Sequence, residues 1–349
     1  MDFSIILKDL TQYPAVSGYE KKISVKIGEL FKTNCDIVET DSLYNVVGIK
    51  KGFSGSGKKV MIIAHSDEIG FLVKNITENG FVKFSCTGYV DSAILPCQEV
   101  VIHGARDIPG VIAAKPAHAL NREDYMKRVN IEDLSIDTGM CSNKIAEFVT
   151  VGDSISFKAV PGKLQGSAFS SKSLDNRCGI VSMLNIMNSI SVVKHDADIY
   201  FAATVQKEFN LCGARITIQK YKPDIAIVLD ACPGCVSSRH HEEALIPGKG
   251  PVIGIGPNLD RKMVKNLICL AREENIPFQY NVFAESTGTE TWVTQVSRLG
   301  IPTALVALPV RYMHTAVETV NLNDIRYISR LVSRYITKSD IETEEFLCY

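Results

Sequence analysis

Residues 197–208 read Ala-Asp-Ile-Tyr-Phe-Ala-Ala-Thr-Val-Gln-Lys-Glu, an apolar run that ends abruptly in polar and charged side chains. Its β-branched, aromatic and small apolar residues are typical of a strand that is buried on both faces of a sheet. A buried strand that presents charge at its carboxyl end is how open α/β sheets form active sites. Taken alone, the stretch also fits a strand that simply leaves the core into solvent.

Other apolar segments of the chain also end in, or lead into, a histidine or a carboxylate. The candidates are His65 with Asp67, then Asp175, Asp230 and His314, in addition to Glu208. Each has a simpler interpretation: a hydrogen-bonded core histidine, a helix N-cap or a solvated strand end. If they converge on one sheet edge, they form a nitrogen and oxygen ligand set for divalent ions such as zinc, cobalt or manganese. Two such ions need a bridging carboxylate between them, and we interpret the set as a dinuclear metal site.

The pattern of helices and strands divides the chain into two parts. From residue 70 to 163, short alternating strands are separated by glycines, which is typical of a compact β module rather than of βαβ units. On both sides of this stretch, helical and buried-strand patterns alternate. We therefore predict an α/β fold with a central mixed sheet flanked by helices, built from residues 1–69 and 164–349. A small β-barrel-like module at 70–163 is inserted in it. Helices are expected at 2–12, 19–34, 178–190, 213–220, 259–274, 289–299 and 322–337, and later strands at 224–230, 278–284 and 303–309.

The composition of the 349-residue chain is that of a globular protein with a large core, with 46% hydrophobic and 22% charged residues. A net charge of −1 and the absence of basic blocks argue against nucleic acid or an anionic membrane as a partner. The N-terminus has no signal-peptide pattern, and no segment is apolar and long enough to span a bilayer. Ten cysteines without regular spacing fit reduced thiols, and we expect a cytoplasmic protein.

One local cysteine pair, Cys232-Pro-Gly-Cys235, has the spacing of a redox motif or of half a zinc site. A second pair with this spacing does not occur in the sequence, and the motif follows a strand outside the usual redox context. We therefore assign neither role to it.

Six short motifs occur along the chain. They are Ala64-His-Ser-Asp-Glu-Ile-Gly70, Ser173-Leu-Asp-Asn-Arg-Cys-Gly179, Val205-Gln-Lys-Glu208 with Leu211-Cys-Gly-Ala214, Val228-Leu-Asp230, Gly248-Lys-Gly-Pro251 and Arg311-Tyr-Met-His-Thr-Ala-Val-Glu318. In this order they resemble the glutamyl and deblocking aminopeptidases, co-catalytic metallo-aminopeptidases that assemble as tetrahedral dodecamers. The resemblance covers nearly the whole chain. Glu318 and Arg311 of the last motif also fit a plain surface ion pair.

The resemblance implies a role for each candidate ligand. Asp175 would be the bridging carboxylate, His65 and Asp230 would complete one metal position, and Glu208 and His314 the other. Asp67 would orient His65 from behind, and the Asp175–Asn176 peptide bond would be cis.

The resemblance also implies cofactors and partners. The cofactors would be two divalent ions per subunit, with zinc and cobalt as the first candidate metals and manganese as the next. The fold would be that of the zinc exopeptidases, and the insert at 70–163 would be the family's dimerisation domain. Short peptides would be the substrates, and the subunits would associate into dimers and a tetrahedral dodecamer.

One position departs from the family pattern. The family has two adjacent glutamates after the strand, the first being the general base, whereas this chain has Lys207-Glu208. A carboxylate can take a proton from the attacking water near neutral pH, but an ammonium cannot unless its pKa falls by several units. Lys207 could also pair with a carboxylate, repel the metals, or point away while another group acts as base. Asn210 stands where the family has glycine, so this loop could differ in shape.

Three functions follow from these residues. The first is a dinuclear metal-dependent aminopeptidase that removes N-terminal residues from peptides, with activity impaired by Lys207. The second is a weak or inactive family member that acts as a peptide-binding or structural subunit. The third is a di-metal deacylase acting on another amide.

Overall fold

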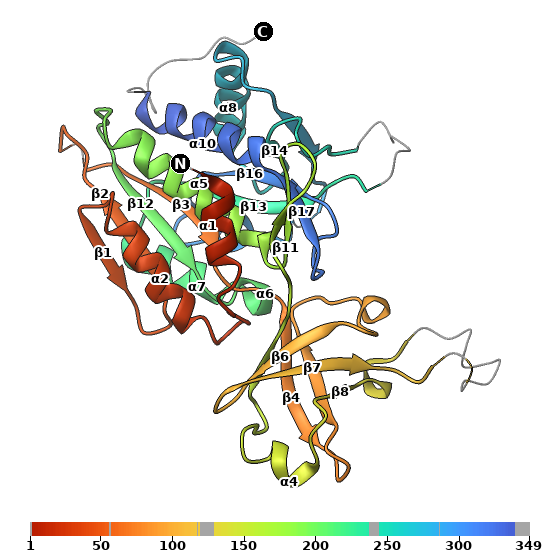
Figure 1. Ribbon diagram of the computed structural model, residues 1–349. Coiled ribbons are helices and arrows are strands. Elements are labelled where there is room, and N and C mark those ends of the chain that lie inside the picture. Colours follow the sequence, from red (N-terminus) through yellow and green to blue (C-terminus); the bar gives the residue numbers. More distant parts are fainter. Residues whose placement is uncertain are drawn as a thin grey trace.

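The computed structural model describes residues 2–55, 57–116, 118, 129–236, 244–285 and 287–338. Its largest element is an eight-stranded sheet in the order β1-β2-β12-β3-β13-β16-β14-β15 (Figure 1). The strands are β1 (Ile37–Thr40), β2 (Val46–Lys50), β3 (Lys59–His65), β12 (Asp198–Thr204), β13 (Ile225–Pro233), β14 (Val252–Ile255), β15 (Gln279–Val282) and β16 (Thr303–Val310). The central strands β12, β3, β13 and β16 are parallel, while β2 and β14 run antiparallel to their inner neighbours. The predicted mixed sheet is confirmed.

The parallel centre of the sheet brings four strand ends to one edge. Thr204 of β12 pairs with His65 of β3, so these two strands end side by side. Asp230 of β13 lies level with Ala307 of β16, near the same edge. The central strands are almost wholly buried, which explains why they read as continuous apolar runs.

Helices flank this sheet, as predicted. They are α1 (Phe3–Leu10), α2 (Lys21–Phe31), α5 (Leu174–Ile190), α6 (Lys207–Asn210), α7 (Cys212–Tyr221), α8 (Arg261–Glu273), α9 (Thr291–Gln295) and α10 (Leu322–Thr337). The helix α5 contacts β3, β13 and β16, and both α1 and α10 pack against it (Figure 1). Most of its side chains are buried, because it lies between the sheet and these helices. None of the helices in the described ranges is long and apolar enough to cross a membrane.

The inserted module is a closed antiparallel barrel in the order β4-β5-β8-β7-β6-β9. Its strands are β4 (Gly70–Ile76), β5 (Val82–Thr87), β6 (Glu99–His103), β7 (Asp107–Ala113), β8 (Ser135–Asp137) and β9 (Ser154–Phe157), with the short helix α4 (Ser142–Ile145) beside them. In Figure 1 the barrel, coloured orange to yellow, lies below the sheet. It has its own core, in which the ring of Phe71 meets those of Phe84 and Phe157 edge-on at centroid distances of 5.0 and 5.2 Å.

A small third sheet joins the two parts. Its strands β10 (Gly162–Lys163), β11 (Ala168–Ser171) and β17 (Glu318–Asn321) are antiparallel. The strand β11 leads from the barrel side directly toward α5, and β17 leads into α10. The strands β11 and β17 were not predicted, because each is only four residues long and has polar neighbours.

One expected helix is shorter than predicted, and a further strand was missed. The helix expected at 289–299 is only α9, Thr291–Gln295, because Arg298 has a left-handed backbone at φ 59° and the chain turns toward Gly300. The strand β14 was missed, because Gly254 and the flanking glycines and prolines read as a loop. Gly254 is needed there, since a Cβ would lie 2.9 Å from Leu259 Cδ1 and 3.0 Å from Leu305 Cβ.

Phe71→Ala is expected to destabilise the protein by about 3–5 kcal/mol, because it removes a fully buried ring that two other rings cannot refill. The measurement is the shift of the unfolding midpoint in urea and by calorimetry. Phe53→Ala, at a side chain that is 74% exposed, is the matched control and should cost less than about 1 kcal/mol. Equal shifts in the two variants would contradict a separately packed barrel core.

Candidate metal centre

The five candidate ligands meet at the carboxyl edge of the parallel strands. His65 ends β3, Asp230 lies in β13, Glu208 lies in α6 just after β12, Asp175 begins α5, and His314 follows β16. They form two groups, His65–Asp175–Asp230 and Asp175–Glu208–His314, in each of which the ligand atoms lie within 4.8 Å of one another. Asp175 is common to both groups.

The geometry around Asp175 is that of a shared carboxylate. Its Oδ1 lies 3.0 Å from His65 Nε2, and its Oδ2 lies 3.2 Å from His314 Nε2. Asp230 Oδ1 is 3.5 Å from His65 Nε2, and Glu208 Oε2 is 3.6 Å from His314 Nε2. Each oxygen of Asp175 therefore faces a different histidine.

The donor set fits divalent ions that prefer imidazole and carboxylate ligands. Asp230 Oδ2 is buried and has no hydrogen-bond partner among the described residues, although an unpaired buried carboxylate oxygen is costly. A cation bound in the His65–Asp175–Asp230 group would satisfy it. The residues present thus fit the two ions that the sequence implies, and the Asp175–Asn176 peptide bond is cis, as the resemblance suggested.

Asp67 lies behind His65 and is fully buried. Its Oδ1 is 3.4 Å from His65 Nδ1, a charge contact rather than a hydrogen bond. Its oxygens accept hydrogen bonds from the backbone N–H groups of Lys207, at 3.0 Å, and of Glu208, at 2.9 Å. Asp67 therefore links the ligand at the end of β3 to the ligand that follows β12.

Glu318 has a role that the sequence did not reveal. The surface pair with Arg311 does not form: Glu318 is buried, and Arg311 Nε donates instead to the Cys235 carbonyl. Glu318 accepts hydrogen bonds from the backbone N–H groups of Asp175, at 3.0 Å, and His314, at 2.8 Å. Burial, followed by repulsion from Asp175, raises the pKa of Glu318 to about 8. The residue ties together two segments that are 139 positions apart.

Several backbone turns around the site are left-handed without glycine. Ser173, Gln206, Leu211, Tyr312 and His314 have φ values of 54°, 56°, 62°, 54° and 63°. Each such residue costs roughly 1–3 kcal/mol and persists where neighbouring contacts hold it. These turns aim the short segments after β12 and β16 back at Asp175. The turn that follows α6 falls on Leu211, next to Asn210, the position where the family has glycine.

Lys207 points into the centre rather than away from it. Its Nζ lies 2.8 Å from Glu208 Oε1, 3.8 Å from Asp230 Oδ1 and 4.0 Å from Asp175 Oδ2. Burial disfavours the ammonium, but attraction by Asp175, Asp230 and Glu208 outweighs burial and holds the pKa of Lys207 well above its ordinary value. The protein groups around Lys207 thus favour its charged form.

The charges of the two histidines and of Asp175 are strongly linked. Although burial lowers the pKa of His314, the nearby Asp175 carboxylate raises it to about 9 overall. Burial would raise the pKa of Asp175, but Lys207 and the two histidines bring it well below its usual range. The protein groups therefore favour an ionised Asp175, which is the form that binds a metal.

The barrel contributes one contact to the centre. The carbonyl of Tyr89 accepts a hydrogen bond from His314 Nδ1 at 2.9 Å, and the two rings lie 6.5 Å apart. This contact fixes which ring nitrogen of His314 faces the carboxylates. No signal in the sequence pointed to Tyr89, because the loop after β5 lies far from every motif.

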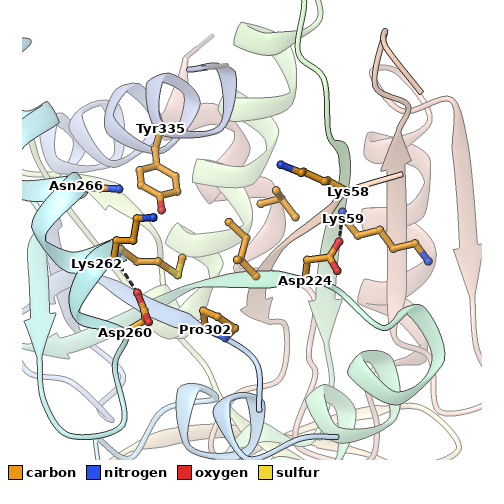
Figure 2. A pocket seen from close by; sticks show the side chains of 11 residues that line it. Lys58, Lys59, Asp224, Asp260, Lys262, Asn266, Pro302 and Tyr335 are labelled. Atoms are coloured by element: carbon orange, nitrogen blue, oxygen red, sulfur yellow. Dashed lines mark hydrogen bonds between the residues drawn. The ribbon is translucent and has the colours of Figure 1, made fainter. Parts of the chain in front are cut away.

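Larger hollows lie away from these ligands. The cavity in Figure 2 has a volume of about 260 Å³ and lies at the opposite edge of the sheet, where β3 and β13 begin. Its lining includes Lys58, Lys262 and Tyr335, and its carboxylates Asp224 and Asp260 accept backbone N–H groups. The cavity does not gather a metal-ligand set. In the cysteine motif, Cys232 is buried in β13, where burial raises its thiol pKa, so no redox role is apparent.

Several known proteins similar to this chain are named aminopeptidases. The model of the M42 glutamyl aminopeptidase family matches residues 45–331. A lysyl aminopeptidase of Pyrococcus furiosus is 31% identical over 92% of this chain and 92% of its own length. The crystal structure of a TET aminopeptidase from the marine sediment archaeon Thaumarchaeota archaeon SCGC AB-539-E09 has a TM-score of 0.92 and 29% identity, with 97% of each chain covered. The TET1 peptidase of Pyrococcus horikoshii, described as assembling into a tetrahedron or an octahedral shell, has a TM-score of 0.84 and 28% identity, covering 96% of this chain and 99% of its own.

Glu290, buried behind the centre, should make stability depend on pH. Burial raises its pKa to about 7, and its Oε1 accepts a hydrogen bond from the Thr204 hydroxyl. Because the folded state holds this proton more tightly than the unfolded state, the stabilisation is complete below about pH 4.5 and is lost as the pH rises toward 7. The stabilisation lost between these two pH values is on the order of 3 kcal/mol.

Glu290→Gln has a neutral side chain at every pH, so the stability of the variant should depend less on pH between pH 5 and 7.5 than that of the wild type. Unfolding midpoints measured across this range for the wild type and the variant are the test. Glu285→Gln, at an exposed position nearby, serves as the control and should follow the wild type. A variant curve parallel to that of the wild type would mean that Glu290 does not titrate in this range.

Proposed function

This chain belongs to the M42 glutamyl aminopeptidase family, and we propose that it is a dinuclear metal-dependent aminopeptidase that hydrolyses N-terminal residues from short peptides. The observation that carries the proposal is the position of Asp175. One buried carboxylate faces a histidine with each oxygen, and each histidine is accompanied by a further carboxylate. This is the arrangement that two neighbouring cations need.

We assign His65, Asp175 and Asp230 to one divalent ion and Asp175, Glu208 and His314 to the other. Zinc or cobalt are the first candidates, and manganese is the third. Ions at these positions would polarise the scissile carbonyl and bind the free α-amine of the peptide. The chain itself holds the ligands in place: Asp67 through His65 and the start of α6, and Glu318 through the backbones of Asp175 and His314.

Lys207 occupies the general-base position, and we propose that it limits turnover. A base must accept a proton from the attacking water, and the carboxylates around Lys207 favour the ammonium form, which cannot accept one. Two alternative functions would use the same metal centre. In the first, the chain binds peptides or serves as a structural subunit with little catalysis. In the second, the centre deacylates another amide.

The assembly and the division into domains are part of the proposal. We assign residues 1–69 and 164–349 to the catalytic domain and 70–163 to a dimerisation domain. The likeness to the Pyrococcus horikoshii peptidase, which can assemble into a tetrahedron or an octahedral shell, and to a structure described as a dodecamer supports our proposal that dimers of this chain build a tetrahedral dodecamer. A cytoplasmic location stays a prediction from the sequence.

Lys207→Glu should raise aminopeptidase activity by about tenfold or more, the low end of what a positioned base contributes. The assay measures kcat/KM on a panel of aminoacyl substrates with zinc or cobalt present. Lys207→Gln, which removes the charge without supplying a base, is the matched control and should gain much less.

Equal rates for Lys207→Glu and Lys207→Gln would rule out the missing base as the limit on turnover. A panel of acylated amides and esters, tested alongside, separates a deacylase from an aminopeptidase. Activity of both variants on acyl amides, without any on free N-terminal residues, would favour the deacylase.

A further inference from the structure

We propose that the Lys207 ammonium competes with the second divalent ion for its ligands, so that the wild-type centre holds one ion firmly and a second only weakly. The inference deepens the proposed function and rests on its metal centre. It concerns how this particular chain fills the two ligand groups.

The Lys207 ammonium is in position to compete for the metal ligands. Nζ of Lys207 lies among the three carboxylates that would bind the two ions, and its shortest contact, 2.8 Å, is to Glu208 Oε1. Asp230 Oδ1 and Asp175 Oδ2 follow at 3.8 and 4.0 Å. A cation is thus already within reach of every ligand carboxylate.

Neighbouring contacts hold Lys207 at this place. Its side chain is 7% exposed, and its backbone N–H donates to Asp67 Oδ1 at 3.0 Å. The preceding Gln206 has a left-handed backbone, and its N–H donates to Glu20 Oε1 at 2.9 Å. Because both backbone N–H groups are fixed by buried or partly buried carboxylates, the turn directs the buried Lys207 side chain into the centre.

The charge balance of the centre also favours a single divalent ion. Asp175, Glu208 and Asp230 supply three negative charges, and one divalent ion together with the Lys207 ammonium balances them. A second ion would leave an excess of two positive charges among neutral histidine ligands. With a carboxylate at position 207, two ions would be balanced instead. Like charges a few ångströms apart in a buried site repel strongly, so this excess positive charge weakens the binding of the second ion.

The geometry also indicates which position is weakened. Glu208, the closest partner of Lys207, belongs to the Asp175–Glu208–His314 group, where His314 is 20% exposed. The His65–Asp175–Asp230 group is fully buried and keeps the unpaired Asp230 Oδ2 for a metal. The first ion therefore belongs in the buried group, and the ammonium competes in the other.

The test is a titration of chelator-treated protein with Zn²⁺ and, separately, Co²⁺, followed by calorimetry and by metal analysis after equilibrium dialysis. The wild type should show one tight step and a second step at least about tenfold weaker. Lys207→Met, which keeps an unbranched side chain one heavy atom shorter and removes its charge, should tighten the second step by at least about tenfold, and Lys207→Glu by more. Lys207→Gln provides a second neutral variant, and thermal unfolding before metal addition shows that each variant is folded.

Lys265→Glu reverses an exposed charge on α8 and should leave both steps unchanged. Two equal tight steps in the wild type, or no response to Lys207→Met and Lys207→Gln, would overturn this inference while leaving the metal centre intact. No binding of either ion to any variant would overturn the proposed metal centre and the inference with it.

Discussion

The structure depends on one buried carboxylate, Asp175, that faces two histidines at once. An ionised carboxylate away from water is stable only where positive charge or hydrogen-bond donors surround it. Here the surroundings come from segments far apart in the chain: the end of β3, the turn after β12 and the turn after β16. The parallel centre of the sheet makes this possible, because it delivers the ends of these strands to a single edge.

A buried ion pair also supports this edge of the sheet. Lys172 Nζ lies 2.7 and 2.5 Å from the two oxygens of Glu68, and both residues are buried. Glu68 follows His65 by three positions, and Lys172 precedes Asp175 by three, so the ion pair joins the two ligand segments. Arg177, fully buried, donates to the Ser66 carbonyl between them. A buried ion pair contributes little net stability, but removing one partner is costly. We interpret this network as one that fixes the positions of the two ligand segments relative to each other.

Lys207 is the main departure from the family pattern that the resemblance implies. The centre keeps the ligand set and its supporting contacts, whereas the group expected to move a proton is a cation. A single substitution of this kind exchanges one negative charge for one positive charge at the centre of the site. We therefore propose that it affects proton transfer and ion binding together, while the candidate ligands keep their places.

The fold class and the candidate ligands could be predicted from the sequence, because both leave local patterns of apolar and polar residues along the chain. Buried strands read as apolar runs, and His65, Glu208 and His314 follow such runs directly. The short strands β11, β14 and β17 were not predictable, since four residues with glycine or polar neighbours carry no periodic signal. Only the tertiary structure revealed the contacts of Glu318 with Asp175 and of Tyr89 with His314, because each contact joins residues more than a hundred positions apart. It also decided the position of Lys207: the sequence showed a lysine at the place of a base, but only packing could bring its ammonium among three carboxylates rather than into solvent.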